Sequence, residues 1–154
     1  MSETVRIADQ LRRSFEGRAW HGDSLLKILD GISAAQAAAR PIKGAHSIWE
    51  LVLHIAAWDA AVLRRLSGKA ASVSKARNFP VIKDTSKVAW HSALGHLKQV
   101  HEELVAAVAA FPDSRLGRGV PGKPARHTYY YMLHGVVQHE LYHAGQIALL
   151  KKLA

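Results

Sequence analysis

The sequence of 154 residues contains no cysteine. This absence excludes a disulfide framework, a thiolate metal site and a cysteine nucleophile, and any thiol used in a reaction would have to come from outside the chain. A chain of roughly 150 residues buries about 68–70% of its unfolded surface, so it needs neither disulfides nor a structural metal to stay folded. We therefore expect any bound metal to serve function.

Long apolar runs are also missing. The best run, residues 104–111, has eight residues, whereas a membrane-spanning helix needs about 20. The N-terminal segment lacks the apolar core and small-residue cleavage site of a secretory signal. The hydrophobic share of 49% and charged share of 21% are typical of globular domains. We expect one soluble, cytoplasmic domain over residues 1–154, with no membrane partner.

Acidic residues are scarce: 12 stand against 21 basic ones, for a net charge of +9. Segments 68–83 and 112–127 each carry four basic residues, with one acid in the second, so together they contribute seven of the nine net charges. Such loops would steer an anionic small-molecule substrate toward a nearby site. Nonspecific nucleic-acid binding is a weaker interpretation because no recognition motif or aromatic–basic interleaving is present. A solvated basic surface without a specific partner is the commonest outcome for loops of this kind.

Apolar residues recur at helical spacing, with no strand-like alternation. Capping residues and glycines predict where each helix begins and ends. The first pattern breaks at Gly17 and Gly22 and resumes after Asp23 as far as Gly31. A capping box at 33–36 predicts a short turn of helix, and a second one at 47–50 opens a helix through about Ser67. Further helices are expected from about 84 or 85 to before Pro112, and from about Thr128 almost to the end. The expected core stripes of the first two long patterns are Val5, Ala8, Leu11 and Phe15, and Ile48, Leu51, Val52, Ile55, Trp58, Val62 and Leu66.

Two long connections separate the last three patterns. Residues 68–84 have no helical periodicity, and at about 3.3 Å per residue they can run back along a helix about 30 Å long. The sequence therefore predicts an all-α four-helix bundle in up-down-down-up order, with a long crossover between the second and third long helices.

Ten histidines are the most unusual part of the composition. His139 and His143 lie four residues apart on one predicted helix face, which suits two ligands of one metal. His54 lies between Leu51 and Trp58 near the core-facing edge of its helix. If the two helices are antiparallel, the levels of the three histidines can coincide within an error of about 2–4 residues in the predicted helix ends. The alternative for His54 is a core histidine bonded to a carbonyl or carboxylate.

Two segments, residues 47–58 (SIWELVLHIAAW) and 139–147 (HELYHAGQI), strongly resemble the signature segments of the DinB-like (YfiT-like) superfamily of metalloenzymes. The resemblance extends over about residues 17–152. It implies a four-helix bundle with a crossover, a homodimer, and a divalent metal held by His54, His139 and His143. Three imidazoles with an open position suit Zn²⁺ first, and also Ni²⁺, Mn²⁺ or Fe²⁺. Relatives that use a low-molecular-weight thiol as S-transferases or isomerases imply the same type of activity here.

Other interpretations remain open. A non-catalytic metal-binding or stress-response module would keep the same fold and histidines. Residues 139–143 also spell HExxH, the metallohydrolase motif in which Glu140 would be the general base, but the extended motif is missing because Gln146 and Leu149 stand at its later positions. A solvated helix carboxylate is the simpler interpretation of Glu140.

Three further histidines have candidate roles. His101 lies in the apolar stripe of its helix and could line the cavity or bond a metal-bound water, although a satisfied core histidine is the simpler interpretation. His21 could contact substrate at the mouth of the bundle, or cap the following helix. His46 precedes the Ser47 cap and is expected to pack near Leu51 in a hydrophobic staple.

Overall fold

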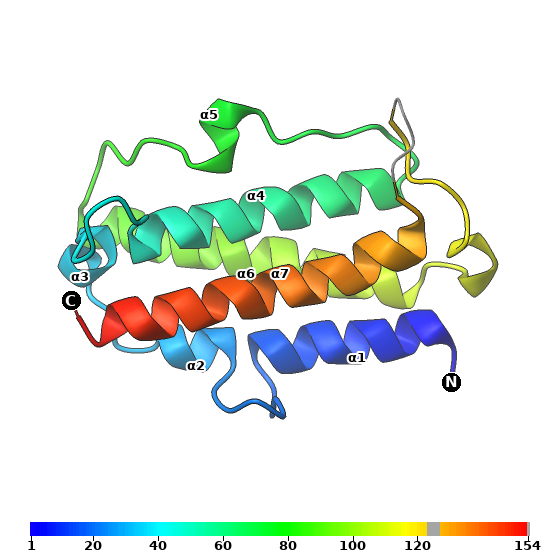
Figure 1. Ribbon diagram of the computed structural model, residues 1–154, viewed down its shortest axis with the longest axis horizontal. Helices are drawn as coiled ribbons and strands as arrows, with labels where there is room; N and C mark the ends of the chain where they lie inside the picture. Colours follow the sequence, from blue (N-terminus) through cyan, green and yellow to red (C-terminus); the bar gives the residue numbers. More distant parts are fainter. Residues whose placement is uncertain (123–126, 154) are drawn as a thin grey trace.

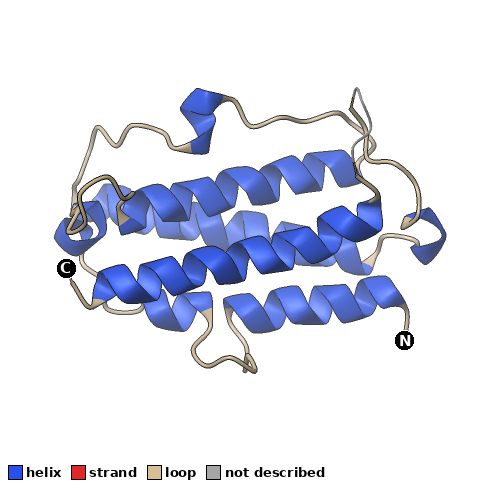
Figure 2. Ribbon diagram, viewed as in Figure 1, coloured by secondary structure: helices blue, strands red, loops and turns tan. Residues whose placement is uncertain are grey.

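The computed structural model describes residues 1–122 and 127–153, and these form helices joined by irregular segments (Figure 2). Four long helices make up the bundle: α1 (Glu3–Phe15), α4 (Ile48–Leu66), α6 (Lys87–Ala109) and α7 (Tyr129–Lys151). The shorter elements are α2 (Leu25–Leu29), α3 (Ala34–Ala38), α5 (Lys75–Asn78) and the 3₁₀ turn η1 (Asp113–Arg115). The described residues contain isolated β-bridges but no strand, which confirms the all-α class.

The order of helix directions follows from the long connection between α4 and α6. Helices α4 and α6 run the same way, and α1 and α7 run the opposite way (Figure 1). The chain between α4 and α6 returns along the outside of α4 and carries α5 on the way (Figure 1). The predicted up-down-down-up order with one crossover is therefore confirmed.

Side-chain caps begin the helices that carry the candidate site. The hydroxyl of Ser47 accepts from the amide of Glu50, and the Glu50 carboxylate accepts from the amide of Ser47, as in a capping box. Thr128 caps α7 by accepting from the amide of Tyr131. Ser86 caps α6, so this helix begins two to three residues later than expected; Asp84 lies outside it and accepts from the amide of Ser86.

The core consists of two apolar clusters. One gathers the beginning of α4 with α2, α3 and the end of α7, and the other gathers the beginning of α1 and α7 with the ends of α4 and α6. Between them each long helix contributes one buried polar side chain, and these are Ser14, Asp59, His101 and Glu140. The middle of the bundle is therefore a polar layer, of which the sequence indicated only His101 within the apolar stripe of its helix.

Two residues of the expected core stripes are not buried, so their predicted burial was wrong. Val5 is 38% exposed, and Ile7 is buried in its place because α1 turns Thr4, Ile7 and Leu11 inward. Trp58 is only half-buried, and its neighbour Asp59 takes the fully buried position one turn after Ile55. A carboxylate therefore stands on the core-facing side of α4.

The two connections are less irregular than expected, because α5 forms within residues 68–84 and η1 within residues 112–127. Of the basic residues predicted in the second loop, Lys123 and Arg126 lie outside the described residues. No helix in the described part of the chain has the length and apolar character needed to cross a membrane.

Candidate metal centre

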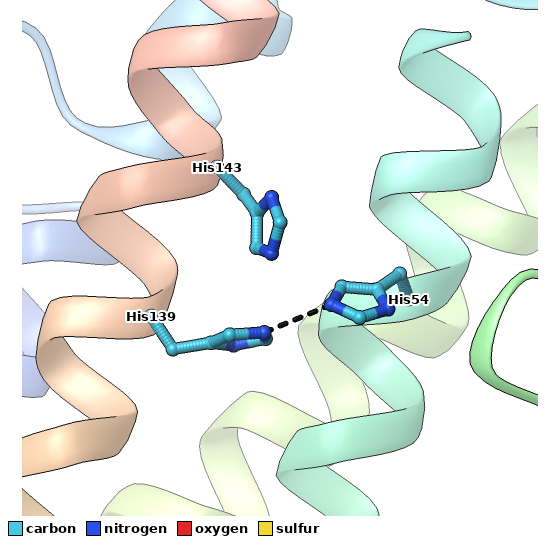
Figure 3. Close-up of side chains that lie close together, drawn as sticks. All are labelled: His54, His139 and His143. Carbon is cyan, nitrogen blue, oxygen red and sulfur yellow. Dashed lines mark hydrogen bonds between the residues drawn. The ribbon is translucent and has the colours of Figure 1, made fainter. Parts of the chain in front are cut away.

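Helices α4 and α7 bring His54, His139 and His143 together, with one ligand atom of each within 4.8 Å of the others. The three rings converge from the two antiparallel helices (Figure 3). The Nε2 atoms of His54 and His139 are 2.9 Å apart. Two nitrogen ligands of one tetrahedral ion lie about 3.3 Å apart, so this spacing is within a few tenths of an ångström of a shared metal. The three histidines predicted to be ligands thus form one cluster.

In two of the three histidines, the ring nitrogen that faces away from the cluster donates a hydrogen bond to a neighbouring residue. The Nδ1 atom of His54 donates to the backbone carbonyl of Asn78, in α5, at 2.9 Å. The Nδ1 atom of His143 donates to the side-chain oxygen of Gln146 at 2.7 Å. Because an imidazole protonated at Nδ1 keeps its lone pair at Nε2, these bonds leave the inward nitrogens able to bind a metal.

Aromatic rings hold the orientation of His54. The Phe79 ring stacks on His54 with centroids 4.3 Å apart, and His46 stacks on Phe79 at 3.5 Å, both nearly parallel. Parallel contacts at these distances must use opposite faces of Phe79. His46 therefore packs on Phe79 in the crossover, and the staple expected for it near Leu51 stays a prediction.

Burial and mutual repulsion keep the three imidazoles neutral. Burial, followed by the nearby His143 and His54, lowers the pKa of His139 to about 3. Burial also lowers the pKa of His54 and of His143, although their acceptors at Asn78 and Gln146 oppose the shift. Neutral imidazole is the form that binds metal ions. The donor set therefore fits a divalent ion that accepts three nitrogen ligands.

A cavity adjoins this cluster through Trp58. The indole ring of Trp58 meets His139 edge-on at 6.0 Å, and its N–H donates to the side chain of Asn78. Trp58 also lines a cavity of about 600 Å³ together with Arg65 and His127. The Arg65 guanidinium lies 5.8 Å from the Trp58 ring and donates to the carbonyl of Ala71. A small molecule in this cavity would lie against Trp58, which adjoins His139, and next to the cationic side chain of Arg65.

Glu140 and His101, two of the catalytic candidates, lie in the polar layer of the core. Glu140 is 1% exposed, so the expectation of a solvated carboxylate was wrong. Its Oε2 atom accepts from the hydroxyl of Ser14, and its Oε1 atom lies 2.7 Å from Nδ1 of His101. Asp59 completes this group, with Oδ2 3.6 Å from the same nitrogen. The carboxylate of Glu140 is therefore engaged with α1 and α6.

The charges of this second group depend on one another. Burial, reinforced by the charge of Glu140, raises the pKa of Asp59 to about 7 even though His101 opposes the shift. Burial alone would lower the pKa of His101, but the carboxylates of Asp59 and Glu140 raise it to about 9.

The remaining candidate, His21, lies in the exposed loop between α1 and α2. That loop is on the opposite side of the bundle from α5, which contacts His54 (Figure 1). His21 lines a separate cavity of about 720 Å³ beside α1 and is not a member of the three-histidine cluster.

Sequence reasoning missed three supporting residues: Asn78, Phe79 and Gln146. The first two lie in a connection without periodicity, so no pattern places them over α4. Gln146 had a detectable signal, because it follows His143 by three residues and side chains three apart meet on a helix. Asp59 also had one, since it stands four residues after Ile55 and three before Val62 on the core-facing stripe.

Comparison with known families agrees with this geometry. The family model of the DinB superfamily matches residues 19–147, which include α4, the crossover and the three histidines. Neither a curated protein sequence nor a solved structure matches the chain significantly.

Proposed function

The chain belongs to the DinB superfamily, and from this membership and its three-histidine cluster we propose that it is a metal-dependent enzyme acting with a low-molecular-weight thiol. The reaction class is an S-transfer or a thiol-assisted isomerisation. The convergence of three neutral imidazoles, within 4.8 Å of one another, is the observation that carries this proposal. Three protein ligands leave a further coordination position for a reactant, as in catalytic zinc sites.

A bound divalent ion would supply Lewis-acid activation of a thiol or a water at that position. His54, His139 and His143 would hold it, and Zn²⁺ is our first choice among Zn²⁺, Ni²⁺, Mn²⁺ and Fe²⁺. Asn78 and Gln146 keep His54 and His143 in the tautomer that presents Nε2.

The cavity beside Trp58 supplies the reactant site in this proposal. Arg65 and His127 line it, and Arg65 retains its charge at neutral pH. These groups favour a substrate or thiol that carries a carboxylate or another anionic group. The apolar face of Trp58 would cover the reacting end beside His139.

The chain contains no cysteine, so the thiol sulfur must come from a separate molecule. In an S-transfer, that sulfur forms a bond to an electrophilic carbon. The leaving group departs with its bonding electrons, and the thiol proton passes to solvent. An isomerisation would instead release the thiol unchanged.

Metal content tests the histidine cluster directly. The wild-type protein, reconstituted with Zn²⁺ and freed of excess ion, should retain metal that the variants His54→Ala, His139→Ala and His143→Ala release. The control is His91→Ala, which removes an exposed histidine of α6 and should leave the metal content unchanged. Equal metal in all the proteins would contradict the proposed ligands.

Turnover separates an enzyme from a binding module. The Zn²⁺-loaded protein is incubated with glutathione, bacillithiol or mycothiol and a chlorinated aromatic electrophile, and the thioether product is measured. Product formation that is lost in His54→Ala and kept in His91→Ala supports the enzyme. Metal binding without turnover across the thiols would favour a non-catalytic module.

A further inference from the structure

Four side chains, one from each long helix, meet in the polar layer between the two apolar clusters. Asp59 is 0% exposed, Glu140 1%, His101 2% and Ser14 3%. Polar groups this deeply buried need partners, because an unpaired group loses its hydration without compensation. This layer therefore requires a physical explanation.

Close approach does not give these groups satisfactory hydrogen bonds. The Nδ1 atom of His101 lies 2.7 Å from Glu140 and 3.6 Å from Asp59. Even so, both nitrogens of His101, both carboxylate oxygens of Asp59 and Oε1 of Glu140 lack a hydrogen-bond partner of acceptable geometry among residues 1–122 and 127–153. Asp59 is thus a fully buried carboxylate with two unpartnered oxygens, next to His101.

This pattern matches ligands that share a cation. Atoms bound to one ion need not point hydrogens at each other, and at bond lengths of 2.0–2.2 Å neighbouring ligands lie about 3.0–3.4 Å apart. The two contacts of His101 lie on either side of that range. One ligand atom from each of Asp59, His101 and Glu140 lies within 4.8 Å of the others.

Charge points the same way. In the described part of the chain, the carboxylates of Asp59 and Glu140 form ion pairs with no side chain other than His101. In the metal-free protein, a proton held by His101 offsets part of this charge. When His101 becomes neutral to act as a ligand, the group carries two negative charges in a site closed to solvent, where uncompensated charge is strongly unfavourable. A divalent cation would bring the sum to zero.

We propose that Asp59, His101 and Glu140 form a second divalent-metal site at the centre of the bundle, separate from the three-histidine cluster. One imidazole and two carboxylates suit a first-row transition ion such as Mn²⁺, Fe²⁺ or Zn²⁺. Ligands on facing helices are the usual way in which bundles build metal sites in their cores. The site does not depend on the proposed thiol chemistry.

Two further observations support the site. The hydroxyl of Ser14 donates to the second oxygen of Glu140 at 2.8 Å, which is the kind of outer contact that orients a ligating carboxylate. Ser14 also lines the cavity of about 720 Å³ beside α1. An ion entering from that cavity would meet Ser14 first and Glu140 immediately behind it.

The experiment counts bound Zn²⁺ by plasma mass spectrometry after metal removal, reconstitution and gel filtration. We expect about two equivalents in the wild-type protein. The triple variant His54→Ala/His139→Ala/His143→Ala should keep about one, and adding Asp59→Asn or Glu140→Gln to it should remove that one. Circular dichroism of each variant reports whether it has folded.

Each result is decisive for one of the two sites. About one equivalent in the wild-type protein, and none in the triple variant, would overturn the second site while upholding the histidine cluster. About one equivalent in both proteins would support the second site and contradict the first. The control Asp23→Asn, at an exposed position, should change nothing. The wild-type stoichiometry needs no substitution, so the test stands even if a core variant fails to fold.

Discussion

The ring of Phe79 lies flat against the imidazole of His54, with centroids 4.3 Å apart and planes within 4° of parallel. Phe79 follows α5 directly, and the carbonyl of Asn78 before it accepts from the same imidazole. The crossover is therefore part of the candidate metal centre as well as a connection. It fixes both the tilt and the tautomer of one ligand.

Removing this stack should weaken metal binding. In Phe79→Ala, His54 keeps its hydrogen bond to Asn78 but loses the ring that restricts its rotation, so we expect the Zn²⁺ affinity to fall about tenfold. Competition with a chromophoric chelator measures it. Val81→Ala, at a position 82% exposed in the same segment, is the control. An affinity within about twofold of wild type would show that the stack does not orient His54.

Gln146 should tune the basicity of His143. Gln146→Leu removes the acceptor 2.7 Å from Nδ1, and we expect Zn²⁺ affinity to fall 10- to 100-fold, roughly the loss typical of outer-shell changes. Gln146→Glu offers a charged acceptor and should bind at least as tightly as wild type. Gln138→Leu, at an exposed position of the same helix, should have no effect. Equal affinity for the Leu and Glu variants would contradict this role.

The metal-free protein should become less stable as pH rises from about 7 to about 9. The pKa of His101 is raised to about 9, so the folded state holds a proton that the unfolded state releases near pH 6.5. The folded state binds more protons in this window, and the free energy of unfolding therefore falls as pH rises. The stabilisation is fully present below pH 6.5 and is lost through pH 9.

Below this window other groups act in opposite directions. The raised pKa of Asp59 continues the fall between about pH 4 and 7, whereas the lowered pKa of His139 opposes it between about 3 and 6.5. Urea denaturation between pH 7 and 9, in the presence of a chelator, isolates the contribution of His101. His101→Gln should flatten the slope, and His96→Gln, at an exposed position of α6, should not. A slope unchanged in His101→Gln would assign it to another group.

The cap of α4 should contribute measurably to stability. Ser47 is 1% exposed, and its hydroxyl accepts from the amide of Glu50. Ser47→Ala leaves that buried amide without its acceptor, so we expect the free energy of unfolding to fall by about 1 kcal/mol. Ser67→Ala, at the exposed far end of the same helix, should change it by less than about 0.5 kcal/mol. Urea denaturation at pH 7 compares the two, and equal losses would count against the cap.

The sequence by itself determined the helices and the choice of ligands. Capping residues and apolar spacing are local properties, so α4 and α7 were predicted nearly to the residue, and the length of the crossover set the direction of α6. The spacing of His139 and His143 is also local, because residues four apart share a helix face. His54 joined them through its level on an antiparallel helix and the family resemblance.

Only the tertiary structure decided what surrounds those ligands. The rotation of α4 about its axis places Asp59 inward and Trp58 beside His139. An apolar stripe defines the buried face of a helix only to within one residue, so the sequence could not show which of these two neighbours faces the core. Asn78 and Phe79 reach His54 from a segment without periodicity, so no local pattern could place them. The meeting of Asp59, His101 and Glu140 depends on three helices packing at one level, and each residue alone looks like a single polar interruption of an apolar face.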